Sequence, residues 1–193
     1  MFNLGSKKQS ASSVWNIKLL TKEYLVEGTF HPKEYELGGD NVFALAATSS
    51  MDEGGIDAFQ RLRLFNAHIQ STGNLISNEQ SFSEWSMLTL NEVVAIIPND
   101  ETSLETAKKA FNDYRHPLEV FVYSGTYRIH AKLLSDTASQ KQSLFAMTGI
   151  IPLTDAKIDC QLPGAKLKNF SVPWLLLNAG ASLHGCGILA QQV

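Results

Sequence analysis

The 193-residue sequence is poor in the features that mark several large functional classes. It has only two cysteines, Cys160 and Cys186, and they are far apart in the chain. Two such cysteines do not suggest a disulfide scaffold, and small buried hydrophobic side chains are the simplest role for them. No apolar run approaches the ~20 residues that a transmembrane helix needs, and residues 1–8 lack the apolar segment of a secretory signal. We therefore expect a soluble cytoplasmic protein that does not contact a membrane.

The sequence also lacks an excess of positive charge. It carries 16 Lys and Arg against 19 Asp and Glu, which gives a net charge of −3, whereas dedicated nucleic-acid-binding proteins usually have a basic stripe. Residues 1–100 hold 7 basic and 12 acidic side chains, and residues 101–193 hold 9 and 7. Nucleic acid is therefore not the expected partner, and any phosphate-binding surface is expected in the second half.

Common catalytic and ligand-binding motifs are missing as well. The sequence contains no GxGxxG turn, no Walker loop and no GxSxG nucleophile elbow. The five histidines form no HExxH pair. His184 and Cys186 share a strand face, and Cys160 is the candidate third ligand, but a zinc site normally needs four ligands or three plus water. We predict that the protein is not an enzyme and that it has no catalytic residue, no cofactor and no bound metal.

What the sequence does contain is an internal repeat. Residues 15–30 and 118–133 align at an offset of 103, with apolar residues at matching places and Tyr24 aligned with Tyr127. In the second copy, two strand-like segments flank Ser124-Gly125, and glycine allows the positive φ of a tight hairpin turn. Each copy therefore predicts an antiparallel β-hairpin.

A second pair of segments, residues 64–69 and 153–158, aligns at an offset of 89. The same offset aligns Trp85 with Trp174. Tryptophans at matching places of two copies favour repeated core anchors over exposed platforms for a base or a sugar. We predict that both tryptophans are largely buried.

Asn66 and Asp155 occupy the same place in this second alignment. A short polar side chain at the start of a strand most often caps a turn by accepting backbone N–H groups. An amide that replaces a carboxylate also argues against acid–base catalysis there. We therefore predict a structural role for both residues.

One helix is expected between the two copies, over residues 100–116. Asp100, Thr102 or Ser103 can cap its start, and Pro117 prevents its continuation. Apolar side chains at spacings of three and four form a stripe that must be buried: Leu104, Ala107, Ala110, Phe111 and Tyr114. The predicted fold is mostly β, with two tandem small barrel-like or sandwich-like units related by duplication and joined by this helix. The expected bounds are 14–99, 100–116 and 117–193.

The second copy contains Tyr127-Arg128-Ile129, followed by the segment Pro152-Leu-Thr-Asp155-Ala156. This pattern resembles a bacterial family of small β-rich domains of unknown function with a YRI…PLTDA signature, here in two tandem copies. The resemblance implies a compact β-rich domain and brings no catalytic residues.

These observations favour a non-enzymatic binding or scaffolding protein built from a duplicated small β domain. The expected partner is a protein, either another protein or a second copy of the chain in a homo-oligomer. The alternative is nucleic-acid or nucleotide binding through a basic face of the second unit. The residues of that face are Arg128, Lys132, Lys157, Lys166 and Lys168.

Overall fold

The computed structural model describes residues 14–31, 62–72, 79–87, 92–110, 116–135, 150–167, 169–179 and 183–187. Its strands are β1 (Trp15–Thr21), β2 (Tyr24–Phe30), β3 (Leu62–Ser71), β4 (Gln80–Met87), β5 (Val93–Pro98), β6 (His116–Ser124), β7 (Tyr127–Ser135), β8 (Ile150–Cys160), β9 (Phe170–Asn178) and β10 (Leu183–Gly187). The helix α2 (Glu101–Ala110) lies between β5 and β6. The expectation of a mostly-β fold is confirmed.

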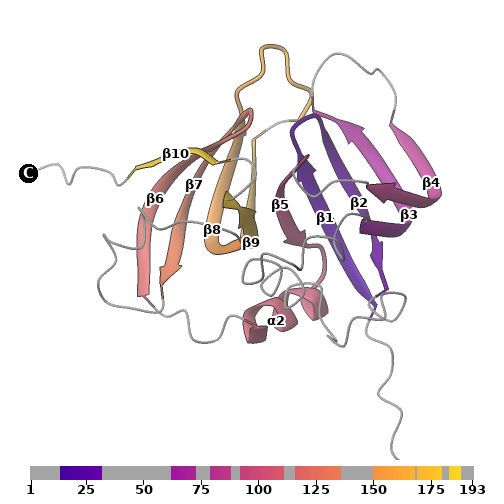
Figure 1. Cartoon of the computed structure of the whole chain (residues 1–193), viewed down its shortest axis with the longest axis horizontal. Coiled ribbons are helices and arrows are strands. Elements are labelled where there is room, and N and C mark those ends of the chain that lie inside the picture. Colours follow the sequence, from indigo (N-terminus) through magenta and orange to yellow (C-terminus); the bar gives the residue numbers. More distant parts are fainter. Residues whose placement is uncertain are drawn as a thin grey trace, which may run out of the picture.

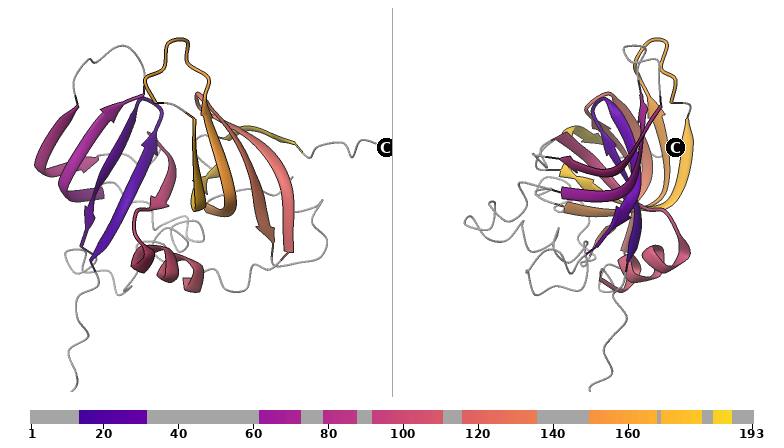
Figure 2. Two further views of the ribbon diagram at one scale, coloured as in Figure 1. Left: turned by 180° about the vertical axis from the view of Figure 1, so that it is seen from behind. Right: turned by 90° about the vertical axis from the view of Figure 1, so that its right-hand side faces the viewer.

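All ten strands belong to one sheet, in the order β10-β6-β7-β8-β9-β5-β1-β2-β3-β4 (Figure 1). Neighbouring strands are antiparallel throughout. The two tandem units expected from the sequence do not close into barrels: β5 pairs with β9 and joins the two halves of the chain in one open sheet. This inner seam pairs Ala95 with Leu177 and Ile96 with Leu176. The sheet is bent and twisted rather than flat, as Figure 2 shows from behind and from the side.

The two halves of the sheet have the same strand order. The first half reads β5-β1-β2-β3-β4 and the second reads β10-β6-β7-β8-β9. Their hairpins also have the same register, because Leu19 faces Val26 in the first and Val122 faces Ile129 in the second. Adding 103 to the residue numbers of the first pair gives those of the second. Residues that align in the sequence repeat therefore also occupy the same positions in the pairing of the two hairpins.

Asn66 and Asp155 lie inside strands and not at a turn, which corrects the expectation of a turn cap. Both have positive φ, 49° for Asn66 and 52° for Asp155. At these places β3 slips by a residue against β2, and β8 slips against β7. Asn and Asp tolerate the left-handed backbone better than other residues with a side chain. Asn66 and Asp155 can therefore occupy equivalent bulges although one is an amide and the other a carboxylate, because both residues adopt the positive φ that the bulge requires.

Asp155→Val is expected to lower the free energy of unfolding by about 1–2 kcal/mol, because a β-branched residue is strained at positive φ. Asp155→Gly is expected to cost less or nothing, since glycine adopts this conformation freely. Both variants remove the carboxylate that pairs with Lys132 at 2.8 Å, so the comparison isolates the backbone. Urea denaturation measures it. Equal losses in the two variants would show that the ion pair, and not the bulge, carries the effect.

The two tryptophans are not at equivalent strand positions. Trp85 faces Leu64 across β3 and β4, whereas Leu175 faces Leu153 across β8 and β9. Trp85 therefore corresponds to Leu175, at an offset of 90. Trp174 is 2% exposed, which confirms its predicted burial, while Trp85 is only partly buried.

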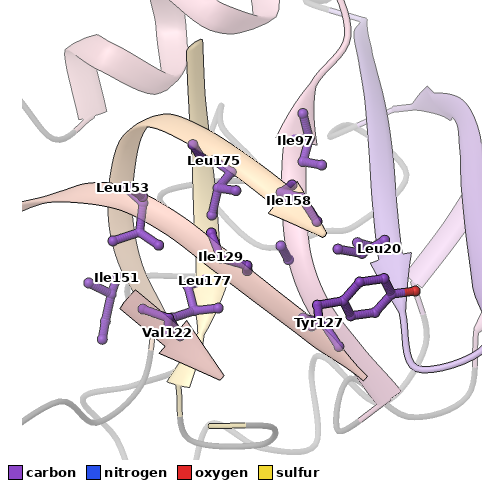
Figure 3. Packing of buried hydrophobic residues seen from close by; sticks show 14 of the residues in the cluster. Leu20, Ile97, Val122, Tyr127, Ile129, Ile151, Leu153, Ile158, Leu175 and Leu177 are labelled. Carbon is purple, nitrogen blue, oxygen red and sulfur yellow. The ribbon is translucent and has the colours of Figure 1, made fainter. Parts of the chain in front are cut away.

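The apolar side chains form two cores on opposite faces of the sheet. Successive side chains of a strand point to opposite faces, and on β9 Trp174 and Leu176 enter the first core while Leu175 and Leu177 enter the second. The first core gathers side chains of β1 to β5 and α2. The second gathers β6 to β9 together with Leu20 of β1 and residues of β5 (Figure 3). Leu25 of β2 also lies in the second core, so strands β1, β2, β5 and β9 serve both cores.

Helix α2 begins as predicted, because the backbone N–H of Ser103 donates to Asp100 Oδ1 at 2.7 Å. Ala107 is fully buried in the first core. The predicted end at residue 116 is wrong, since His116 already belongs to β6. The residue before a proline avoids the helical conformation, and Pro117 imposes this on His116. Two members of the predicted stripe, Phe111 and Tyr114, lie outside the described residues.

Candidate functional site

The cationic residues singled out in the second half fall partly on one face. Arg128 and Lys132 alternate along β7 with buried Ile129 and Ala131, so they point away from the second core. Lys157 of β8 is exposed and lies directly across from His130 of β7. Lys166 is exposed in the segment between β8 and β9, and Lys168 lies outside the described residues. The structure therefore brings Arg128, Lys132 and Lys157 together.

Two of these three cations are held by carboxylates on β8. Arg128 donates from Nε and Nη2 to Asp159 Oδ2, at 3.1 and 2.6 Å. Lys132 Nζ donates to Asp155 Oδ2 at 2.8 Å. The hydrogen bond to Asp159 raises the pKa of Arg128 above its ordinary value, and the hydrogen bond to Asp155 does the same for Lys132. Both donors are therefore already committed to acidic partners.

Further pairs join β6 to β7 on the same face. His130 Nε2 lies 2.7 Å from Glu119 Oε1, and its ring stacks on Phe121 with centroids 4.4 Å apart. Tyr123 lies across from Arg128 and is 49% exposed. We call this surface the charged face; its ionisable residues are Glu119, Arg128, His130, Lys132, Asp155, Lys157 and Asp159.

The charged face has no excess of positive charge. With His130 neutral, three cations stand against the carboxylates of Glu119, Asp155 and Asp159. Phosphate-driven binding depends on cations that are free to replace condensed counterions. The sequence suggested a basic patch because it showed the cations alone. The acids could have been found by continuing the alternation of β8, in which residues 155, 157 and 159 are separated by one residue each.

The other chemistry-bearing side chains of the described residues form no such cluster. In the described part of the chain no three His, Cys, Asp or Glu residues lie close enough to hold a metal ion. Cys160 and Cys186 are free thiols and half-buried, and burial raises the pKa of Cys186. No helix among the described segments has the length and apolar character needed to cross a membrane.

The two edges of the sheet form the second candidate surface. Among the described residues, no strand pairs with the outer side of β4 or of β10. Residues 79–84 on and beside β4 are all exposed, and Phe82 is 38% exposed. Edge strands are usually protected by lysine, by proline or by a cover, and β4 contains neither lysine nor proline. An open edge of this kind can accept another strand.

The turns of the two hairpins touch each other. Tyr127 donates its buried hydroxyl to the Thr21 carbonyl at 2.9 Å, and Thr126 Oγ1 donates to the Lys22 carbonyl at 3.5 Å. Figure 3 shows Tyr127 extending from β7 toward Leu20 on β1. Although β7 and β1 are not neighbours in the sheet, the bend brings them together around the second core.

Tyr127→Phe is expected to lower the free energy of unfolding by about 1 kcal/mol at neutral pH, because it removes this hydrogen bond. Burial raises the pKa of Tyr127 from 10.0 to about 12. The stability linked to this group is thus complete below pH 10 and is lost as pH rises toward 12. Urea denaturation from neutral to alkaline pH should show a shallower alkaline decline for Tyr127→Phe than for the wild type. Exposed Tyr123→Phe should follow the wild type; parallel declines for all three proteins would contradict the assignment.

Comparisons of the chain with models of known protein families, with curated proteins and with solved structures found no match. The resemblance to the YRI…PLTDA family therefore stays a prediction.

Proposed function

We propose that the protein is a non-enzymatic binding or scaffolding protein, built from a duplicated five-stranded unit, that recognises protein partners by strand addition at its sheet edges. The observation that carries the proposal is the open ten-stranded sheet: among the described residues no strand pairs with the outer side of β4, and its residues 80–84 are exposed. An added strand gains main-chain hydrogen bonds from such an edge, and pockets for alternate side chains give specificity.

The inner seam supports this proposal. At this seam β5 of the first half pairs with β9 of the second half. The strands β6, β7 and β8 separate them in the sequence. The seam shows that the outer strand at one end of a five-stranded half, β5, pairs with the outer strand at the other end of the next half, β9. By its place in the first half, β4 corresponds to β9, and it should therefore accept a strand with the sequence of β5.

A labelled peptide of residues 92–99, which contains β5, tests the proposal on the full chain. We expect saturable binding by fluorescence anisotropy and no binding of a scrambled peptide. Neighbouring backbone N–H groups of a strand point to opposite sides, so one of Ser86 and Met87 directs its N–H toward β3 and the other directs it outward. The two variants to compare are Ser86→Pro and Met87→Pro. The variant that removes the outward N–H should keep the stability of the protein and lose peptide binding. Absence of peptide binding, or binding unaffected by either proline, would refute strand addition at β4.

The alternative, nucleic-acid or nucleotide binding, draws on the shared face of Arg128, Lys132 and Lys157 beside exposed Tyr123. Because Asp159 and Asp155 neutralise two of these cations, we expect no salt-sensitive binding of single- or double-stranded oligonucleotides at physiological ionic strength. Titration by fluorescence anisotropy measures this. Binding in the micromolar range that Arg128→Glu abolishes would favour the alternative over strand addition.

A further inference from the structure

We propose that the partner at both edges is a second copy of this chain: β10 of one copy pairs antiparallel with β4 of the next and repeats the inner seam between copies. This inference rests on the proposed strand addition and names its partner. Figure 1 places β10 and β4 at opposite ends of the molecule, so each copy offers one edge of each type.

The first argument is that β10 repeats β5. On β5, Ile96 faces Leu19 of β1, and on β10, Cys186 faces Val122 of β6. The residue numbers differ by 90 on the outer strand and by 103 on its neighbour. The register also shifts by one residue at the same place in both halves. In the first half the shift follows the pair of Val93 with Thr21, and in the second half it follows the pair of Leu183 with Ser124. A shared register and a shared bulge make β10 the counterpart of β5 residue by residue.

The second argument is that β4 repeats β9 in the same way. Met87 faces Leu62 and Leu177 faces Ile151, and the adjacent pairs continue the same offsets. In the inner seam, Leu177 faces Ala95. Transferring that register to the outer edges places Gly185 of one copy opposite Met87 of the next, and Cys186 opposite Ser86.

The third observation is that β10 is little covered. Among the described residues no strand pairs with its outer side. A Cβ atom added at Gly185 or at Gly187 would meet nothing within 4 Å, whereas the corresponding residues of β5, Ala95 and Ile97, are buried in the second core.

The outer seam is expected to be weaker than the inner one. Gly185 stands where β5 has Ala95, and Ser86 stands where β9 has Leu176. Smaller and more polar residues bury less apolar surface, and apolar burial is the main favourable term in association. A reversible assembly follows, in contrast to the permanent seam within the chain.

The proposed contact is head-to-tail, because two different edges meet. Such an interface repeats one operation from copy to copy and gives a ring if the rotation closes or a filament if it does not. The ring and the filament both contain the contact between β10 and β4. A symmetric dimer would instead pair β4 with β4 or β10 with β10.

Disulfide trapping tests the register. In a Cys160→Ser background, Ser86→Cys should form disulfides between copies with the native Cys186 on mild oxidation, since cross-strand partners lie close enough for a disulfide with slight adjustment. Non-reducing gels should show a ladder of multimers that Cys186→Ser abolishes. Ser83→Cys is the matched control, the same change on the same strand away from Cys186, and it should give no ladder. Absence of a ladder with Ser86→Cys, or a product that survives Cys186→Ser, would overturn the register.

Sedimentation of the unmodified chain tests the assembly independently of any variant. We expect species at multiples of 21.3 kDa that grow with concentration, and a single monomeric species would overturn the inference. A monomer that still binds the peptide of residues 92–99 would leave strand addition standing with a partner other than the chain itself. A monomer that does not bind the peptide would refute both proposals.

Discussion

Trp174→Ala is expected to lower the free energy of unfolding by about 3–5 kcal/mol, the usual cost of removing a buried tryptophan. Trp174 is 2% exposed. It extends from β9, a strand of the second half, into the core that β1, β2 and β3 of the first half enclose. The variant therefore leaves a cavity where the two halves meet. Such a loss is a large part of the stability of an ordinary domain.

Urea denaturation followed by circular dichroism measures the loss, and Trp85→Ala is the matched control. Trp85 contacts the same core but is only partly buried, so its alanine variant should lose clearly less. Equal losses in the two variants would contradict the structural difference between the tryptophans.

Gly28→Ala is expected to cost about 1–3 kcal/mol, the usual penalty for overpacking a filled core. The added Cβ would lie 3.0 Å from Leu64 Cβ and 3.2 Å from the Phe65 carbonyl oxygen. Because one of these neighbours is backbone, rotation of a side chain does not relieve the contact. The site lies opposite the bulge at Asn66.

Gly187→Ala is the control for this substitution, since its Cβ meets nothing within 4 Å. Thermal and urea denaturation should show a loss for Gly28→Ala and little change for Gly187→Ala. Ala131 occupies the place of Gly28 in the second half and is buried there, so the two bulges must differ in spacing. Unchanged stability of Gly28→Ala would show that β3 can move away without cost.

The local structure could be predicted from the sequence because hairpins and helix caps depend on neighbouring residues. The apolar alternation around Ser124 identified β6 and β7. The possible caps Asp100, Thr102 and Ser103 located the start of α2, and the structure shows that Asp100 is the cap. The inner seam could not be predicted, because nothing in the sequences of β5 and β9 specifies that they pair. The alignment of Trp85 with Trp174 was one residue off, and a shift of one residue exchanges the two faces of a strand.

The candidate surfaces were predictable to different degrees. Alternation along β7 placed Arg128 and Lys132 on one face correctly, since the period of a strand is two. Their neutralisation by Asp159 and Asp155 depends on the register between β7 and β8, which is a property of the folded sheet. The open edges at β4 and β10 depend on the order of all ten strands, and no local pattern encodes that order.

The sharing of strands between the two cores has a consequence for synthesis on the ribosome. Leu20, Leu25 and Ala95 belong to the first half of the chain, yet they pack in the core that β6 to β9 complete. When the first half has emerged, these side chains have no core to enter until the last strands are made. Growing chains with apolar surface and unpaired strand edges are prone to aggregate. The interval between the synthesis of β5 and that of β9 is therefore when the nascent chain most needs protection by chaperones.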